Sequence, residues 1–137
     1  GIYGDMHDSD PSATFRYLAE QLNRSELAYL HVIEPRIVGP DDREAGQYAE
    51  PVASRDLRAF YQGKIMAAGG FQPEEAEETW QKNEASPIAF GRLFIANPDL
   101  PARIQAGAPM NKWDRSTFYG GGAEGYTDYA FLNAENV

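Results

Sequence analysis

The feature that most constrains this fold is a segment in which two short apolar runs each end at glycine. The segment covers residues 63–97, GKIMAAGGFQPEEAEETWQKNEASPIAFGRLFIAN, with an acidic, helix-like stretch between the runs Ile65–Ala68 and Ile88–Phe90. Gly69-Gly70 follows the first run and Gly91-Arg92 follows the second. An order of strand, helix and strand favours two parallel strands joined by a crossover helix, so both loops are expected at the carboxyl ends of the strands.

The two glycine loops are suited to binding a phosphate group. Glycine lets backbone N–H groups approach an anion closely, and a following helix N-terminus favours negative charge. Arg92 adds a permanently charged, two-pronged donor. In a (β/α)8 barrel, the loops after the last two strands frequently form a phosphate site. We therefore expect one phosphate-bearing ligand, and the alternative from the residues alone is two ordinary turns with a surface arginine.

Composition excludes several classes of protein. The 137 residues suit one domain, and a hydrophobic content of 42% is enough for a core. The absence of cysteine excludes disulfides and thiolate metal sites. A net charge of −9 without a basic run argues against nucleic-acid partners. No apolar run approaches the roughly 20 residues of a membrane span, and no signal pattern is present. The sequence thus predicts a soluble, cytoplasmic protein.

The first half of the chain predicts a helix, a strand and a second helix. Asp10-Pro11 is a good helix start, and the apolar face that follows comprises Phe15, Leu18, Ala19 and Leu22. Leu27–Ile33 is nearly continuously apolar, as expected for a strand buried on both faces. Residues 37–53 predict a long loop, either a functional lid or mobile surface. Ser54 is expected to cap a helix that carries Leu57, Phe60 and Tyr61.

The second half predicts two further helices. Pro73 begins an acidic helix with Ala76 and Trp80 on its inner face, and Asn97–Asp99 begins one with Leu100, Arg103 and Ile104. The resulting order is α-β-α-β-α-β-α. Three parallel strands cannot close a barrel, and they would leave two exposed edges on a sheet that is built to be buried. The chain also begins on a helix with no preceding strand, so we expect it to be part of a larger assembly.

Three segments carry a resemblance to a known family. They are STFYGGGAEGYTDY (116–129), AFGRLFIANPDLPARI (89–104) and LAYLHVIEPR (27–36), and they closely resemble the Old Yellow Enzyme family of flavin-dependent ene reductases. The resemblance implies an α/β fold, the C-terminal part of a TIM (β/α)8 barrel, with strands six to eight plus the C-terminal segment. Residues 1–137 would then form a single partial domain.

The resemblance also implies an activity. In the family, NAD(P)H reduces a non-covalently bound FMN, which passes hydride to an activated alkene, usually an α,β-unsaturated carbonyl compound. The family's carbonyl-binding pair and proton-donating tyrosine lie on earlier strands, and neither His7 nor His31 matches that pair. We therefore expect no catalytic residue in this chain, and a complementary N-terminal barrel portion as its partner, from a separate chain or a split parent.

The family's cofactor and substrate sites transfer to six positions. By resemblance, Gly69 and Gly70 match the phosphate loop after strand seven. Gly91 and Arg92 match the loop after strand eight, where the arginine meets the FMN phosphate. Two aromatic residues follow in the tail: Phe118 matches a residue beside the dimethylbenzene edge of the flavin, and Tyr119 matches one that faces the substrate. From the residues alone, these two would be a packed C-terminal anchor.

Other readings stay open from the sequence. The chain could be a non-catalytic partial barrel that binds a phosphorylated ligand or another protein. Arg36 could reach a substrate or cofactor, or pair with an acid. The run Glu74–Glu78 is expected on an outer helix face, and Trp80 and Trp113 are expected to pack. Five acids without fixed ligand spacing favour helix capping or solvated surface over a metal site: Asp8, Asp10, Glu34, Asp41 and Asp42.

Overall fold

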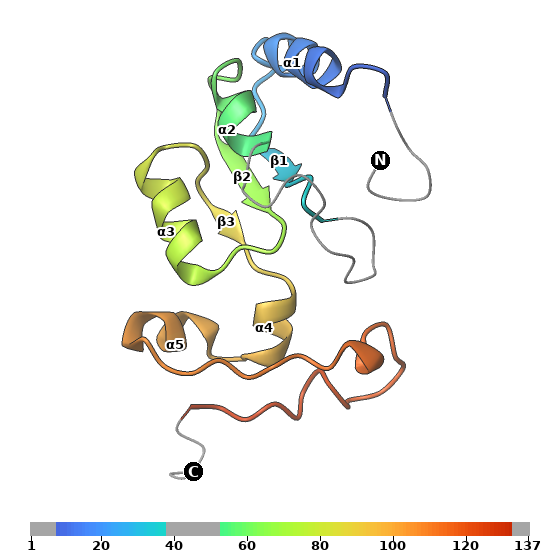
Figure 1. Ribbon diagram of the computed structural model, residues 1–137, viewed down its shortest axis with the longest axis vertical. Coiled ribbons are helices and arrows are strands. Elements are labelled where there is room, and N and C mark those ends of the chain that lie inside the picture. The colour runs from blue at the N-terminus through green and yellow to red at the C-terminus, as the bar shows by residue number, and fades with distance from the viewer. Residues whose placement is uncertain (1–7, 38–52, 133–137) are drawn as a thin grey trace. The chain divides into compact units, whose positions relative to one another are not determined.

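A computed structural model describes residues 8–37 and 53–132 (Figure 1). The chain forms two compact units, one within residues 1–89 and the other within residues 90–137. The loop predicted for residues 37–53 lies outside the described residues except at its two ends, Ile37 and Ala53. Among the described helices, none has the length and apolar character that a membrane span requires.

A parallel sheet forms the centre of the first unit. Its described strands are β1 (Leu30–Ile33), β2 (Ile65–Ala68) and β3 (Ile88–Ala89), in the order β1-β2-β3. Both pairings are parallel, which confirms the predicted sheet. The predicted start of the first strand at Leu27 is wrong, because the ladder begins only where the Leu30 N–H donates to the Lys64 carbonyl at 2.8 Å.

The described helices of this unit are α1 (Pro11–Leu22), α2 (Ala53–Arg58) and α3 (Pro73–Gln81). The predicted start of α1 is confirmed, since Asp10 Oδ1 accepts the Ala13 N–H at 3.0 Å. The start of α3 at Pro73 is also confirmed. The cap predicted at Ser54 is wrong, because Ser54 already lies within α2.

A carboxylate from the end of β1 caps α2 instead. Glu34 is fully buried and accepts the Ala53 N–H at 2.8 Å and the Ser54 N–H at 3.0 Å. The Ser54 hydroxyl donates to the same carboxylate at 2.6 Å. These bonds join two segments that are 19 and 20 positions apart in the sequence, so Glu34 fixes where α2 begins.

The two faces of the sheet differ in burial. Val32, Ile65 and Ala67 are buried on the face that carries Glu34 and α2. On the opposite face, His31 is exposed and Ile33 is 44% exposed. The prediction of a strand buried on both faces is therefore wrong for β1, because the described part of the chain covers only one side of it.

Two predicted helix faces differ from the structure in the first unit. In α1 Ala19 is buried, but Phe15 is 53% exposed and Leu18 is 45% exposed, since among the described helices and strands only the short α2 packs closely against this helix. In α3 the buried positions are Ala76 and Thr79. Trp80 directly follows Thr79 in the sequence, lies at the margin of the buried face, and is 56% exposed.

The second unit contains α4 (Arg92–Ala96), α5 (Leu100–Ala106) and a short 3-10 helix, η1 (Arg115–Thr117). Leu93, Ala96 and Leu100 form its buried apolar positions. Arg103 lies within α5 as predicted, and it is buried, with 4% exposure. Ile104 also lies within α5 as predicted, with 38% exposure.

Candidate functional site

The turn after β2 requires glycine at both of its positions. Gly69 has φ +120 and Gly70 has φ +70, values that other residues adopt only with strain. A Cβ on Gly69 would also lie 3.0 Å from the Glu34 backbone nitrogen. The predicted glycine turn is therefore present, and its two peptide groups have a fixed direction.

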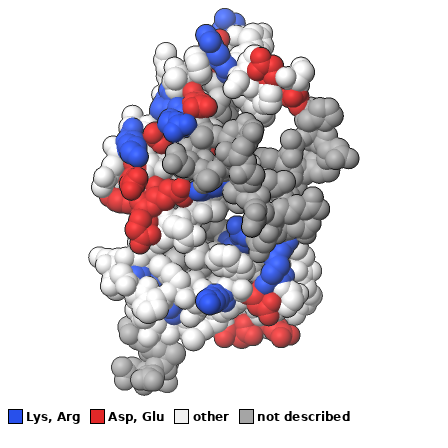
Figure 2. All heavy atoms as spheres, in the orientation of Figure 1, with Lys and Arg blue, Asp and Glu red and all other residues white. Residues whose placement is uncertain are grey.

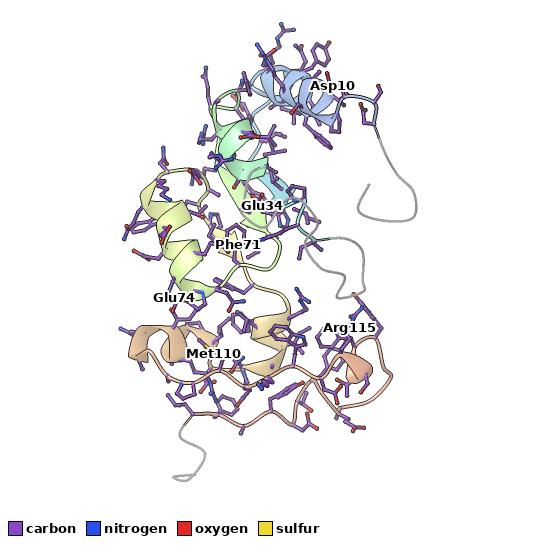
Figure 3. The ribbon with its side chains drawn as sticks, viewed as in Figure 1. Asp10, Glu34, Phe71, Glu74, Met110 and Arg115 are labelled. Carbon is purple, nitrogen blue, oxygen red and sulfur yellow. The ribbon has the colours of Figure 1, made fainter. Side chains whose placement is uncertain are left out.

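Arg36 reaches this turn from the end of β1. Its Nε donates to the Gly69 carbonyl at 2.7 Å, and Nη1 and Nη2 donate to the two carboxylate oxygens of Glu75 at 2.7 Å each. The guanidinium lies 4.8 Å from the ring centre of Phe71. Figure 3 shows Phe71 in the loop that follows β2. Of the two sequence interpretations of Arg36, pairing with an acid is confirmed.

The second glycine loop begins α4. Gly91 precedes the helix with φ −90, and no side chain caps the helix there. No described heavy atom lies within 4 Å of where a Cβ on Gly91 would be. The Arg92 guanidinium lies 5.1 Å from the ring centre of Trp113. Trp113 thus supports Arg92, a role that its interpretation as a packing residue missed.

The C-terminal segment 116–129, the tail, carries two aromatic residues that differ in how far they are exposed. Phe118 is half-buried, whereas Tyr119 is 85% exposed and has φ +60. The Arg115 guanidinium lies 5.2 Å from the Phe118 ring and 5.8 Å from the Tyr119 ring. The Tyr119 N–H donates to the Tyr126 hydroxyl at 3.0 Å. Tyr119 is therefore held by its backbone and presents its ring to solvent, so it is not a packed anchor.

Local hydrogen bonds shape the loop that carries these aromatic residues. Gly125 has φ +73, and a Cβ there would overlap the Thr117 side chain. Its N–H donates to Asp128 Oδ1 at 2.8 Å. Asp114 Oδ1 accepts the hydroxyl of Ser116 at 2.7 Å and its N–H at 2.8 Å, and these two bonds lower the pKa of Asp114.

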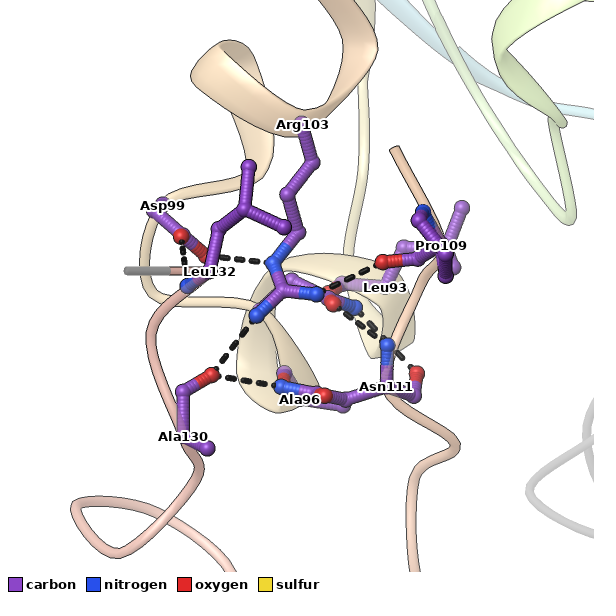
Figure 4. Close-up of polar contacts among 9 residues, drawn as sticks. Leu93, Ala96, Asp99, Arg103, Pro109, Asn111, Ala130 and Leu132 are labelled. Atoms are coloured by element: carbon purple, nitrogen blue, oxygen red, sulfur yellow. Dashed lines mark hydrogen bonds and ion pairs between the residues drawn. The ribbon is translucent and has the colours of Figure 1, made fainter. Parts of the chain in front are cut away.

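A buried arginine fastens the last described residues to α5 (Figure 4). Arg103 donates to Asp99 Oδ1 at 2.6 Å, to the Pro109 carbonyl at 2.6 Å and to the Ala130 carbonyl at 2.8 Å. Asp99 Oδ2 accepts the Leu132 N–H at 2.6 Å. This N–H is the main cause of the lowered pKa of Asp99, and Arg103 lowers it further.

Two asparagines complete this arrangement. Asn111 donates to the Ala130 carbonyl at 2.8 Å and to the Ala96 carbonyl at 2.9 Å. Its own N–H donates to Asn97 Oδ1 at 2.7 Å. Sequence reasoning missed this network. The available signal was a charged residue on the inner face of α5, four positions after an aspartate.

The sequence-predicted site residues are divided between the two units. Gly69 and Gly70 are in the first unit, and Gly91, Arg92, Phe118 and Tyr119 are in the second. The capping interpretation is confirmed for Asp10, whereas Asp8 is exposed and accepts the Asp10 N–H and the Thr14 hydroxyl. Asp41 and Asp42 lie outside the described residues.

Acidic side chains gather over α3 (Figure 2). Glu74, Glu77 and Glu78 are exposed, as predicted for an outer helix face. Glu75 differs, since its side chain is only 29% exposed and is bound to Arg36.

Comparisons with known proteins give matches over most of the chain. The sequence profile of the NADH:flavin oxidoreductase / NADH oxidase family matches residues 3–111. A putative 12-oxophytodienoate reductase 6 of Oryza sativa subsp. japonica is 44% identical over 133 residues, which cover 96% of this chain and 33% of that protein. 12-Oxophytodienoate reductase 2 of Arabidopsis thaliana is 39% identical over 96% of this chain and 34% of its own length.

Solved structures also match over most of the chain. Morphinone reductase matches with a TM-score of 0.79 and 41% identity, over 96% of this chain and 34% of that chain. The old yellow enzyme of Trypanosoma cruzi matches with a TM-score of 0.80 and 31% identity, over 93% and 32%. The chain therefore spans about a third of the length of the relatives it matches.

Proposed function

Because the chain belongs to the NADH:flavin oxidoreductase / NADH oxidase family, we propose that it is the FMN-phosphate-binding section of an ene reductase. The resemblance to the Old Yellow Enzyme family is confirmed, and the cofactors of that family are FMN and a nicotinamide reductant. We place the chain at the C-terminal third of the barrel, as strands six to eight and the C-terminal segment. Both compact units would then belong to one partial domain.

The turn after β2 fits a phosphate. Gly69 and Gly70 both have positive φ, and glycine lets backbone N–H groups approach an anion closely. Glu34 and Arg36 bound this turn on the protein side. We assign one part of the FMN phosphate to the N–H groups of these two glycines.

The observation that carries the second half of the proposal is the open position of Gly91. Apart from its chain neighbours, no described residue lies within 4 Å of a Cβ there, and its φ of −90 is outside the left-handed region. A ligand that approaches the backbone closely would give a reason for glycine at this position. Arg92, stacked on Trp113, would supply the charged donor to the phosphate.

The tail would contribute beside the flavin ring. We assign Phe118 to the dimethylbenzene edge and Tyr119 to the substrate pocket. The exposure of Tyr119 and its left-handed backbone support this role, because strained and exposed aromatic residues are concentrated at functional sites. When bound, FMN supplies hydride to an activated alkene after reduction by NAD(P)H.

The remaining two thirds of a family member must come from elsewhere in the assembly. Among the described strands, β1 has a neighbour only on its β2 side, and the face that bears His31 and Ile33 is uncovered. We propose that a preceding strand pairs with this edge, in the same polypeptide or a second one. The carbonyl-binding pair and the proton donor would lie in that portion, and a cytoplasmic location stays a prediction.

Replacement of Arg92 by alanine tests the phosphate assignment. Loss of a charge-assisted contact should weaken FMN binding by about 1.5–3 kcal/mol, measured by fluorescence titration of the flavin-free assembly. Arg55→Ala is the matched control, since Arg55 is a half-exposed arginine paired with Asp56 on α2. Equal FMN affinity in the two variants would refute the assignment of Arg92 to the phosphate, whereas an assembly that binds no FMN would favour a non-catalytic partial barrel.

A further inference from the structure

We propose that Arg36 is a positioning residue for the FMN phosphate, which holds the Gly69-Gly70 turn in place and neutralises Glu75 beside it. This inference rests on the proposed function, and it adds two residues that would not themselves touch the cofactor. It explains why an arginine and a glutamate meet beside a turn whose N–H groups are assigned to an anion.

The contacts of Arg36 hold the Gly69-Gly70 turn from the side that faces the protein. Its Nε donates to the Gly69 carbonyl at 2.7 Å, so the peptide after Gly69 has its oxygen directed toward the protein. Because a peptide is planar, the N–H of Gly70 then points to the opposite side. A turn with this peptide already oriented loses less conformational entropy when a phosphate binds.

Phe71 and Glu75 hold the Arg36 guanidinium in place. Phe71 is 3% exposed, and its ring lies 4.8 Å from the guanidinium, which restricts the plane of that group. The bidentate bonds to Glu75 use both terminal nitrogens and leave Nε for the Gly69 carbonyl. Lysine could pair with Glu75, but it could not make all three contacts in one plane.

The charge of Glu75 makes the pairing necessary. Glu75 is in the first turn of α3, only five positions after Gly70, and its side chain is 29% exposed. A partly buried carboxylate is poorly screened by solvent, so it would repel a phosphate at the neighbouring turn. Arg36, whose side chain is 9% exposed, neutralises the charge of Glu75 beside the Gly69-Gly70 turn. Glu78, on the same helix, is 67% exposed and pairs with Lys82 in solvent.

The experiment measures FMN affinity in the flavin-free assembly, at a temperature well below each variant's thermal midpoint. Arg36→Ala should raise the Kd for FMN by about tenfold or more. Arg36→Lys should raise it less, because the charge remains. The double variant Arg36→Ala/Glu75→Gln should bind FMN more tightly than Arg36→Ala alone, since the unpaired carboxylate is gone. Glu78→Gln is the matched control and should bind normally.

The salt dependence separates positioning from simple destabilisation. In Arg36→Ala, added salt should screen Glu75 and reduce the difference in affinity from the unsubstituted protein. Normal FMN binding by Arg36→Ala would overturn the inference, and so would a double variant no better than the single one. Failure of the unsubstituted assembly to bind FMN would instead overturn the proposed function, and this inference with it.

Discussion

Two glycines in similar loops differ in their backbone and surroundings. Gly69 is glycine because its φ is +120 and its neighbour Glu34 leaves no room for a side chain. Gly91 has a negative φ of −90, and no described residue other than its chain neighbours lies within 4 Å of a Cβ there. A requirement of the fold at Gly69 and the proposed requirement of a ligand at Gly91 can therefore be measured separately.

Alanine at each of these glycines should give opposite results. Gly69→Ala forces an L-residue into a left-handed turn and should lower the free energy of unfolding by more than about 1 kcal/mol. Gly91→Ala should change stability by about 1 kcal/mol or less, yet weaken FMN binding. Thermal unfolding and flavin titration of both variants provide the comparison. Unchanged FMN affinity in Gly91→Ala would contradict a close approach of phosphate to this backbone.

The pKa of Asp99 makes the end of the tail sensitive to acid. The Leu132 N–H and Arg103 lower this pKa in the folded protein below the reference value of 3.8. The stabilisation is therefore complete above the unfolded-state pKa, and it is lost as the pH falls through the lower, folded value. The Leu132 amide proton should shift in NMR spectra over this acidic range. An amide shift that is constant down to the acid unfolding of the protein would argue against the bond to Asp99.

At the scale of elements, a polar network joins the tail to α5. Arg103, Asp99 and Asn111 bind the backbone at Pro109, Ala130 and Leu132, at both ends of the loop that carries Phe118 and Tyr119. The chain between these ends contains little regular structure, apart from η1. The position of the two aromatic residues thus depends on bonds that are remote from them in sequence.

Arg103→Ala should weaken the attachment of residues 109–132 to α5. The change removes the Arg103 bonds to Asp99 Oδ1 and the Pro109 carbonyl and one of two bonds to the Ala130 carbonyl, and should cost about 2–4 kcal/mol in the free energy of unfolding. Hydrogen exchange of the amides in residues 109–132 should increase more than elsewhere. Gln105→Ala, on the exposed face of the same helix, should have little effect. Equal exchange in the two variants would show that the network does not hold the tail.

The elements that were predictable from sequence are those with local signals. Pro11 and Pro73 mark helix starts, and Ile65–Ala68 forms β2 with the predicted bounds. The errors concern side chains whose burial depends on distant neighbours, such as Phe15 and Trp80. The cap by Glu34 and the bonds of Arg103 could not be predicted, because they join segments that meet only in the folded chain.

At the scale of the whole molecule, the described sheet has the pattern expected for one part of a larger parallel sheet. β1 and β3 are its two outer strands, and a three-stranded parallel sheet leaves both edges without a strand partner. The relatives are about three times as long as this chain. We therefore expect the stable form to contain the preceding strands, with the exposed faces of α1 and β1 covered by them.

The most direct test of this account is an absorption spectrum of the native material, with its mass determined on the same sample. We predict the visible absorption of a bound flavin, in an assembly with the mass of a whole family member, which should oxidise NADPH or NADH in the presence of an enone. Colourless protein in which this chain occurs alone would contradict the account, because a folded chain without flavin or further strands would serve some other purpose.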